Sequence, residues 1–183
     1  QYAAGAVGVD LGVKNMATLS TGEMISNPRF LRTAEKTIKK LQRKIARCQK
    51  GSKNSIRLKQ RLARRHHEIA LRRAGYINEL TSALASSFSA IAIEDLNVAG
   101  MTSSARGTVE NPGKNVKGKA GLNRSILDIS PGHFRTLLEY KCADRGVDIQ
   151  VVNRFFPSSQ LCSSCGSKTT ILLAQRVYHC EVC

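Results

Sequence analysis

Residues 6–12 of the 183-residue chain read AVGVDLG, a short run of small and β-branched residues that ends at a glycine. A run of this length and composition predicts a buried strand. Residues 90–96 read AIAIEDL and repeat the pattern, because apolar residues again lead into an acid. Both runs are too apolar for a solvent-facing edge of a sheet, so we expect them in its interior. Asp10 and Glu94 then lie at the ends of two interior strands.

These two acids are the candidate catalytic residues and the candidate Mg²⁺ ligands. A buried carboxylate costs several kcal/mol unless it is paired or binds a cation. Alternation along a strand puts Asp10 on the same face as Gly8, and Glu94 on the same face as Ala92, so small neighbours leave room for a ligand. If the strands are adjacent, the carboxylates repel each other and a divalent metal resolves the repulsion, as in two-metal nucleases. The alternative is that each acid only caps a turn.

Three other acids are weaker candidates. Asp95 follows Glu94 and points to the other face of its strand. Asp128 precedes a predicted helix and Asp144 lies near the end of that helix, so neither has the setting of a buried strand. We therefore do not assign them to the catalytic site.

The remaining N-terminal strands form a predicted antiparallel meander. Residues 16–20 and 23–25 flank Thr21 and Gly22, which are typical of a hairpin turn. Together with residues 6–12 they make three short strands in a row. Residues 1–154 are predicted to form one α/β domain.

The second half of this domain alternates between irregular and regular segments. Residues 97–123 are rich in Gly, Ser, Asn and Lys and predict a long flexible loop. Residues 129–145 predict a helix that Ser130 caps, with proline at its first position, and that Gly146 ends. Residues 148–152 predict a last strand. The order of elements predicts an α/β fold with a mixed sheet.

The chain carries 29 basic and 13 acidic residues, a formal net charge of +16. This excess is too large for an ordinary enzyme of small molecules and indicates nucleic acid as the partner. An anionic membrane surface is the weaker alternative, because no lipidation motif supports it. No apolar run approaches the roughly 20 residues that span a bilayer. No secretion signal is recognisable at the start, so we expect a cytoplasmic, nucleoid-associated protein.

More than half of the basic residues fall between residues 29 and 73, where 17 Lys and Arg face two acids. Apolar residues at helical spacing predict two helices here, a hairpin over about 30–87, interrupted by KGSKNS at 50–55. Gly51 is the expected end of the first helix, and Asn54 or Ser55 the expected cap of the second. A solvated surface is the alternative, but such surfaces usually mix charges. The cations expected to contact nucleic acid are Arg43, Lys44, Arg47, Lys50, Lys53, Arg57, Arg61, Arg64 and Arg65.

Four of the six cysteines fall within the last 22 residues, as Cys162-Ser-Ser-Cys165 and Cys180-Glu-Val-Cys183. The pairs are separated by 14 residues, which is close to the spacing of a structural zinc site. Four thiolates fill a tetrahedral Zn²⁺ shell, so the predicted ion is structural. Residues 176–179 alternate as a short strand into the second pair. Redox pairs and chance spacing are the alternatives to this predicted zinc ribbon over residues 155–183.

Five stretches together resemble the transposon-encoded TnpB family, also called OrfB-type, which is similar to the nuclease part of type V CRISPR effectors. They are GVDLGVKNMAT (8–18), NPRFLR (27–32), KLQRKIARCQKGSKN (40–54), AIEDLNVAGM (92–101) and FFPSSQLCSSCG (155–166). The last stretch is the most specific, and the resemblance covers nearly the whole chain.

The resemblance implies an RNase H-like fold of the RuvC type and an RNA-guided DNA endonuclease that uses Mg²⁺, with two ions in the complete site. It implies DNA and a guide RNA as partners. Asp10 and Glu94 match the acids of the first two RuvC motifs, and the four clustered cysteines match the zinc ligands. The basic helices match the part of the family that lies along nucleic acid.

The chain also departs from the family pattern. The family has a third acid shortly after the fourth cysteine, whereas this sequence ends at Cys183. The sequence also has no initiator Met and lacks the N-terminal domains that hold the guide. We therefore expect the nuclease and ribbon portion of a longer protein, with an incomplete catalytic site in these residues. A DNA-binding remnant or repressor and a DNA-joining transposase are the alternatives.

Overall fold

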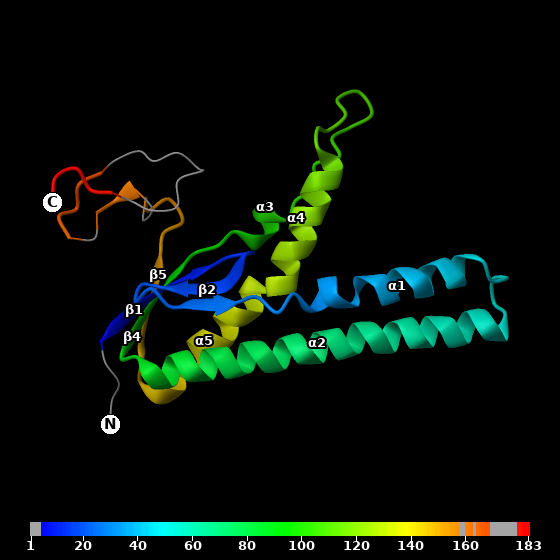
Figure 1. Cartoon of the computed structure of the whole chain (residues 1–183), viewed down its shortest axis with the longest axis horizontal. Coiled ribbons are helices and arrows are strands. Elements are labelled where there is room, and N and C mark those ends of the chain that lie inside the picture. Colours follow the sequence, from blue (N-terminus) through cyan, green and yellow to red (C-terminus); the bar gives the residue numbers. More distant parts are fainter. Residues whose placement is uncertain (1–4, 158–159, 163, 169–178) are drawn as a thin grey trace.

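A computed structural model of the chain describes residues 5–157, 160–162, 164–168 and 179–183. The strand expected at 176–179 therefore lies outside the described residues, except for His179. The helices and strands in chain order are β1 (Ala6–Leu11), β2 (Asn15–Leu19), β3 (Met24–Ser26), α1 (Phe30–Ala46), α2 (Lys53–Ser87), β4 (Ala90–Glu94), α3 (Val98–Met101), α4 (Val116–Ile129), α5 (Pro131–Arg145) and β5 (Asp148–Val152). The sheet lies at one end of the molecule, and α1 and α2 project away from it (Figure 1).

The five strands form one mixed sheet in the order β3-β2-β1-β4-β5. β2 is antiparallel to β1 and to β3, whereas β4 is parallel to β1 and to β5. The mixed α/β sheet and the N-terminal meander are therefore confirmed. In the parallel pair Val9 lies opposite Ile93, so the carboxyl ends of β1 and β4 are side by side.

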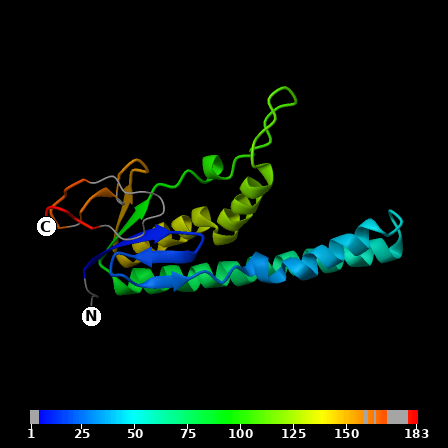
Figure 2. The same cartoon turned by 45° about the horizontal axis from the view of Figure 1, so that its top comes forward.

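The two faces of the central strands have different surroundings. Helices α2 and α5 run along the same side of the sheet (Figure 1, Figure 2). The buried cluster on that side joins the β-branched residues of β1 and β4 to both helices, namely Val7, Val9, Ile91, Ile93, Ile77, Leu84, Phe134 and Leu138. Burial of each such side chain stabilises the fold by ~1.5–3 kcal/mol. The small residues Gly8 and Ala92 alternate onto the opposite face, which carries a pocket.

The predicted helical hairpin is confirmed, but its turn differs from the expectation. Helix α1 ends at Ala46, because the amides of Arg47 and Cys48 bond to carbonyls three residues back and tighten the last turn. Gly51 then lies in the connecting turn with a φ of 79°. Ser52, and not Asn54 or Ser55, caps α2: its hydroxyl accepts a hydrogen bond from the Ser55 amide at 3.2 Å.

No helix among the described residues is long and apolar enough to cross a membrane. Helix α2 has the length, at 35 residues, but its outer face is basic.

The loop expected over residues 97–123 is confirmed only in part: residues 102–115 contain no helix and only an isolated bridge, whereas residues 98–101 and 116–123 are helical. Asn97 caps the short helix α3 by accepting a hydrogen bond from the Gly100 amide at 3.0 Å. Helix α4 then starts at Val116, and Asn123 donates to the carbonyls of Thr102 and Ser103 at 2.7 and 3.0 Å. These contacts join residues that are distant in the sequence, and they offset the low helix propensity of the glycines in α4. Composition alone predicted an irregular segment here, because it does not reveal such contacts.

Helix α5 begins at Pro131 and ends before Gly146, which has a φ of 68°, as expected. The predicted side-chain cap at Ser130 is wrong. Ser130 has a φ of 53°, and its hydroxyl donates to the carbonyl of Leu127 at 3.1 Å. The reason is that α4 runs directly into α5, so Ser130 belongs to the turn between two helices.

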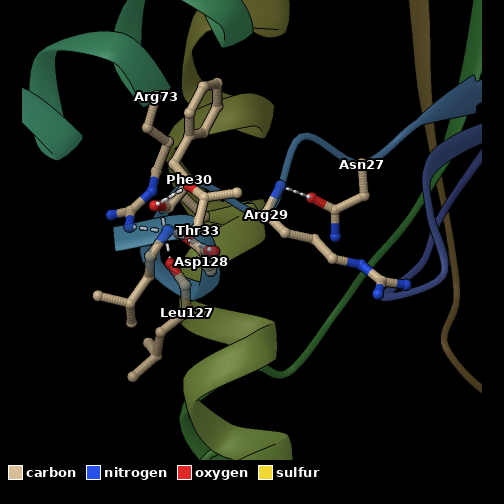
Figure 3. A network of polar contacts seen from close by, with 9 residues as sticks. Asn27, Arg29, Phe30, Thr33, Arg73, Leu127 and Asp128 are labelled. Atoms are coloured by element: carbon tan, nitrogen blue, oxygen red, sulfur yellow. Dashed lines mark hydrogen bonds and ion pairs between the residues drawn. The ribbon is translucent and has the colours of Figure 1, made fainter. Parts of the chain in front are cut away.

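Asp128 joins three helices (Figure 3). Its two carboxylate oxygens accept hydrogen bonds from the Leu31 amide at 3.0 and 3.2 Å, in the first turn of α1. The same carboxylate pairs with the Arg73 guanidinium of α2 at 2.7 Å, and the Asp128 side chain is only 6% exposed. The N-cap residue of α1, Arg29, provides no side-chain cap. Asp128 therefore acts as its cap from α4, and its role is structural.

We expect Asp128→Ala to lower the free energy of unfolding by about 3 kcal/mol, because the Arg73 charge and the Leu31 amide lose their shared acceptor. Denaturant unfolding measures the change. Asp144→Ala is the control: Asp144 is exposed on α5, and its loss should stay within about 0.5 kcal/mol. Equal midpoints for the two variants would contradict the structural role of Asp128.

Candidate functional site

A pocket of about 420 Å³ opens on the face of the sheet opposite α2 and α5. It crosses the carboxyl ends of β1, β4 and β5. Its lining residues are Gly8, Val9, Asp10, Thr18, Leu19, Ser20, Ala92, Ile93, Glu94, Val152, Asn153 and Phe156. Asp10 and Glu94 are the only acids among them.

The structure brings Asp10 and Glu94 together as the strand pattern predicted. Each follows the paired residues Val9 and Ile93 on adjacent parallel strands. Gly8 and Ala92, the small residues expected beside them, also line the pocket. One expectation is wrong: both carboxylates are exposed, not buried. The reason is that the core helices α2 and α5 pack on the other face, and the acids lie at the mouth of an open pocket.

No residue that the structure describes compensates the charges of the two acids. Partial desolvation by the pocket walls raises the pKa of Asp10. Desolvation, and then the charge of Asp10, raise the pKa of Glu94. Within the described part of the chain, neither carboxylate accepts a hydrogen bond or forms an ion pair. Two neighbouring carboxylates repel each other when both are ionised, and this repulsion favours binding of a proton or a divalent cation.

Asp95, which follows Glu94 in the sequence, differs from the two pocket acids because it forms ion pairs. Its carboxylate accepts from Arg135 at 2.7 Å and from Arg154 at 3.3 Å. It does not line the pocket, and neither do Asp128 and Asp144. The structure thus separates Asp10 and Glu94 from the other acids that the sequence offered.

Asn153 and Phe156 also line the pocket, and neither was a predicted site residue. They follow β5, and the parallel pairing of Glu94 with Val152 brings them beside the acids. The stretch FFPSSQ was recognisable as a motif, but the pairing of β4 with β5 was needed to place it at this site.

The four clustered cysteines converge as their spacing predicted. Their sulfurs all lie within 4.8 Å of one another. The Sγ atoms of Cys162 and Cys183 are 3.5 Å apart, and those of Cys165 and Cys180 are 3.6 Å apart. Zn–S bonds of about 2.3 Å in a tetrahedron place sulfurs ~3.8 Å apart, so the donor set fits one zinc ion. The separations are too long for disulfides, whose sulfurs lie about 2.05 Å apart.

The first cysteine pair has the geometry of a metal-binding turn. The Gly166 amide donates to the Cys162 carbonyl at 2.9 Å, and Gly166 has a φ of 70°, which favours glycine. Amides of Cys165 and Ser164, in that order, lower the pKa of the Cys162 thiol to about 6. Amides directed at a sulfur stabilise the thiolate that a zinc ion requires.

All nine cations predicted to contact nucleic acid are exposed on the hairpin of α1 and α2. Four of them, Arg57, Arg61, Arg64 and Arg65, line a surface hollow of about 320 Å³ along α2 together with Glu68. Arg65 pairs with Glu68 at 2.7 Å, so its charge is partly compensated. The hairpin thus offers a basic surface far from the sheet (Figure 1).

Two family models match the chain. The model OrfB_IS605, described as "Probable transposase", matches residues 3–105. The model described as "Cas12f1-like, TNB domain" matches residues 132–183, the part that contains the cysteine cluster.

Similar curated proteins carry names of one kind. A "Putative RNA-guided DNA endonuclease" of Streptomyces pristinaespiralis is 39% identical over 88% of this chain and 37% of its own length. "Putative RNA-guided DNA endonuclease InsQ" of Escherichia coli K12 is 38% identical over 96% of this chain and 44% of its own length. A Mycobacterium tuberculosis protein of the same description is 31% identical over 87% of this chain and 34% of its own length.

The chain therefore spans less than half the length of the curated relatives it matches. The first family model covers more than half of the chain, and both models agree with the motifs found in the sequence. The chain belongs to the OrfB_IS605 family, the TnpB or OrfB-type family that its sequence motifs resemble.

Proposed function

We propose that this chain is the RuvC-type nuclease portion of an RNA-guided DNA endonuclease that hydrolyses phosphodiesters with Mg²⁺. The observation that carries the proposal is the pair of carboxylates of Asp10 and Glu94 at the carboxyl ends of adjacent parallel strands, with no partner for either among the described residues. The sheet, with an antiparallel meander followed by parallel strands, supports an RNase H-like fold. The names of the relatives support DNA as substrate and a guide RNA as partner.

Asp10 and Glu94 are the residues that would hold Mg²⁺. Carboxylate oxygens are its preferred protein ligands, and the open pocket leaves space for substrate beside them. When bound, Mg²⁺ supplies electrostatic stabilisation of the charge that develops at phosphorus. The protein's own contribution is to fix the two carboxylates on a rigid sheet, where they need no rearrangement on binding.

We further propose two functional parts, residues 1–154 as the nuclease domain and residues 155–183 as a zinc ribbon. The match of the second family model to residues 132–183 supports a distinct C-terminal module. The zinc ion would be structural, because four thiolates leave no open coordination position.

Removal of the acidic charges should stabilise the metal-free fold. The pKa of both carboxyls is raised, so their protonated forms stabilise the folded state. This stabilisation is fully present below about pH 4, and it is lost as pH rises through the raised pKa. At pH 7 with a chelator, Asp10→Asn and Glu94→Gln should raise Tm by at most about 2–4 °C, since both groups are solvent-screened. Thermal unfolding with and without Mg²⁺ measures this. Mg²⁺ should raise Tm of the wild type and not of the variants; an equal shift in all three would contradict the metal site.

The basic hairpin should bind nucleic acid through phosphates. We expect the double variant Arg57→Ser, Arg61→Ser to weaken binding to a duplex and to reduce the slope of log affinity against log salt by about 1.8. The matched control, Arg57→Lys with Arg61→Lys, keeps both charges and should keep the slope. Fluorescence anisotropy at several salt concentrations measures both. An unchanged slope in the serine variant would remove these two residues from the interface.

A DNA-joining transposase is the second candidate, because the matching family model carries the description "Probable transposase". The same two acids would serve it. Incubation of the complete, guide-loaded protein with matching DNA, with Mg²⁺ or with a chelator, separates the candidates. Mg²⁺-dependent breaks alone support the endonuclease, and joined strands support the transposase. Binding without either product would leave a DNA-binding remnant or repressor.

A further inference from the structure

Phe156 is an exposed aromatic residue in the same pocket as the two acids. Its side chain is 54% exposed, yet it lines the pocket with Asp10 and Glu94. Single exposed apolar residues are common on proteins and need no explanation by themselves. Phe156 does need an explanation, because it lies within the candidate catalytic pocket of a chain that has only five Phe and no Trp.

The backbone holds Phe156 in place. The Asn153 side chain accepts a hydrogen bond from the Phe155 amide at 2.9 Å, and the Asn153 carbonyl accepts one from the Phe156 amide at 2.9 Å. The Asp95 amide donates to the Val152 carbonyl at 2.9 Å and ties the end of β5 to the end of β4. Because the turn is ordered before any ligand arrives, little conformational entropy is lost when the ring makes a contact.

The pocket is not built to hold a phosphate by itself. Apart from the two acids, its described lining residues are apolar or neutral, and none is Lys or Arg. This contrasts with the 29 basic residues of the chain. Phosphate recognition usually uses such cations. A nucleic acid that enters the pocket would therefore present an uncharged part to Phe156.

A nucleobase is the uncharged part of a nucleic acid that an aromatic ring recognises. Every base has a π-face, and stacking on aromatic side chains is the common way in which proteins hold single strands. Inside a duplex both faces of a base are covered by its neighbours, so only an unpaired or unstacked base can stack on the ring.

We propose that Phe156 stacks on an unpaired base of the strand presented to Asp10 and Glu94, and so positions that strand for cleavage. The inference rests on the proposed nuclease function and gives Phe156 the role of a positioning residue for the strand. Phe155 is not part of this platform. It is 85% exposed, does not line the pocket, and has the Arg154 guanidinium 5.9 Å from its ring centre.

The first test measures cleavage by the complete, guide-loaded protein on DNA with a single abasic site moved along the cut strand. Phe156→Ala should lower the rate about tenfold. Phe156→Leu should lower it similarly, because it keeps apolar area without a ring, and Phe156→Trp should recover most of the loss. At one position, the abasic site should lower the wild-type cleavage rate about tenfold. The same abasic site should not lower the rate of Phe156→Ala below its rate on intact DNA. Phe155→Ala is the matched control and should stay within about twofold.

The second test does not depend on cleavage. Phe156→Trp in the complete protein is titrated with an oligothymidylate and with an abasic strand of equal length, with the wild type as the fluorescence blank. Thymines should quench the added Trp fluorescence and the abasic strand should not. A Trp placed by Phe155→Trp should respond to neither.

The outcomes separate the two proposals. The stacking role alone is overturned if cleavage depends on Asp10 but the Trp of Phe156→Trp is not quenched and Phe156→Ala cleaves within twofold of the wild-type rate. Quenching without cleavage under any condition overturns the nuclease and leaves a base-stacking site. Absence of both overturns both, and a loss that is equal at every abasic position also overturns the stacking role.

Discussion

Asp10→Ala and Glu94→Ala each lower Mg²⁺-dependent DNA cleavage by the guide-loaded protein by about 10³-fold or more. Each substitution removes one of the two carboxylates that line the pocket. The expected loss corresponds to ~4 kcal/mol of transition-state stabilisation, a size typical of losing electrostatic stabilisation at the reacting centre. Cleavage rates under single-turnover conditions measure the loss, because product release then does not limit the rate.

Two further measurements make this result specific. Asp144→Ala, an exposed acid on α5 outside the pocket, should leave the rate within about twofold of wild type. Binding of guide and target should be unchanged in both pocket variants, since the far end of the basic hairpin projects away from the sheet that carries the two acids (Figure 1). Cleavage by Asp10→Ala or Glu94→Ala at the wild-type rate would overturn the assignment of the site.

The two acids could be found from sequence because a local signal carried them. The runs AVGVD and AIAIE predict their strands, and alternation predicts which residues share the face of each acid. That the strands are adjacent is a long-range property. The pairing of Val9 with Ile93 joins residues more than eighty positions apart, and only the structure places them side by side.

The features that the sequence did not predict depend on such long-range contacts. Helix α4 contains two glycines, and its hydrogen bonds from Asn123 reach back to the carbonyls after α3. Asp128 lacked any local sign of its role, because its partners Leu31 and Arg73 come from other helices. Phe156 reaches the pocket only through the pairing of β5 with β4. Local patterns predict strands and helices, whereas these positions follow from how the elements pack.

The cysteine cluster, in contrast, was predictable from the sequence, since its spacing alone predicted the convergence that the sulfur distances confirm. We expect one zinc ion per chain, measured by metal analysis of the complete protein. Cys162→Ser or Cys183→Ser should lose the ion. Hydrogen exchange in the ribbon segment should then accelerate by on the order of 100-fold, because metal binding and local folding are coupled.

The sheet and its core should retain their protection in these variants, because the buried cluster on α2 and α5 contains none of the four clustered cysteines. Cys48→Ser is the matched control: Cys48 follows α1, lies outside the cluster, and should leave both zinc content and exchange unchanged. Acid should release the ion as well, because protons compete with the metal for thiolates. Unchanged ribbon exchange after complete removal of zinc would mean that the four thiols converge for a reason other than a structural metal.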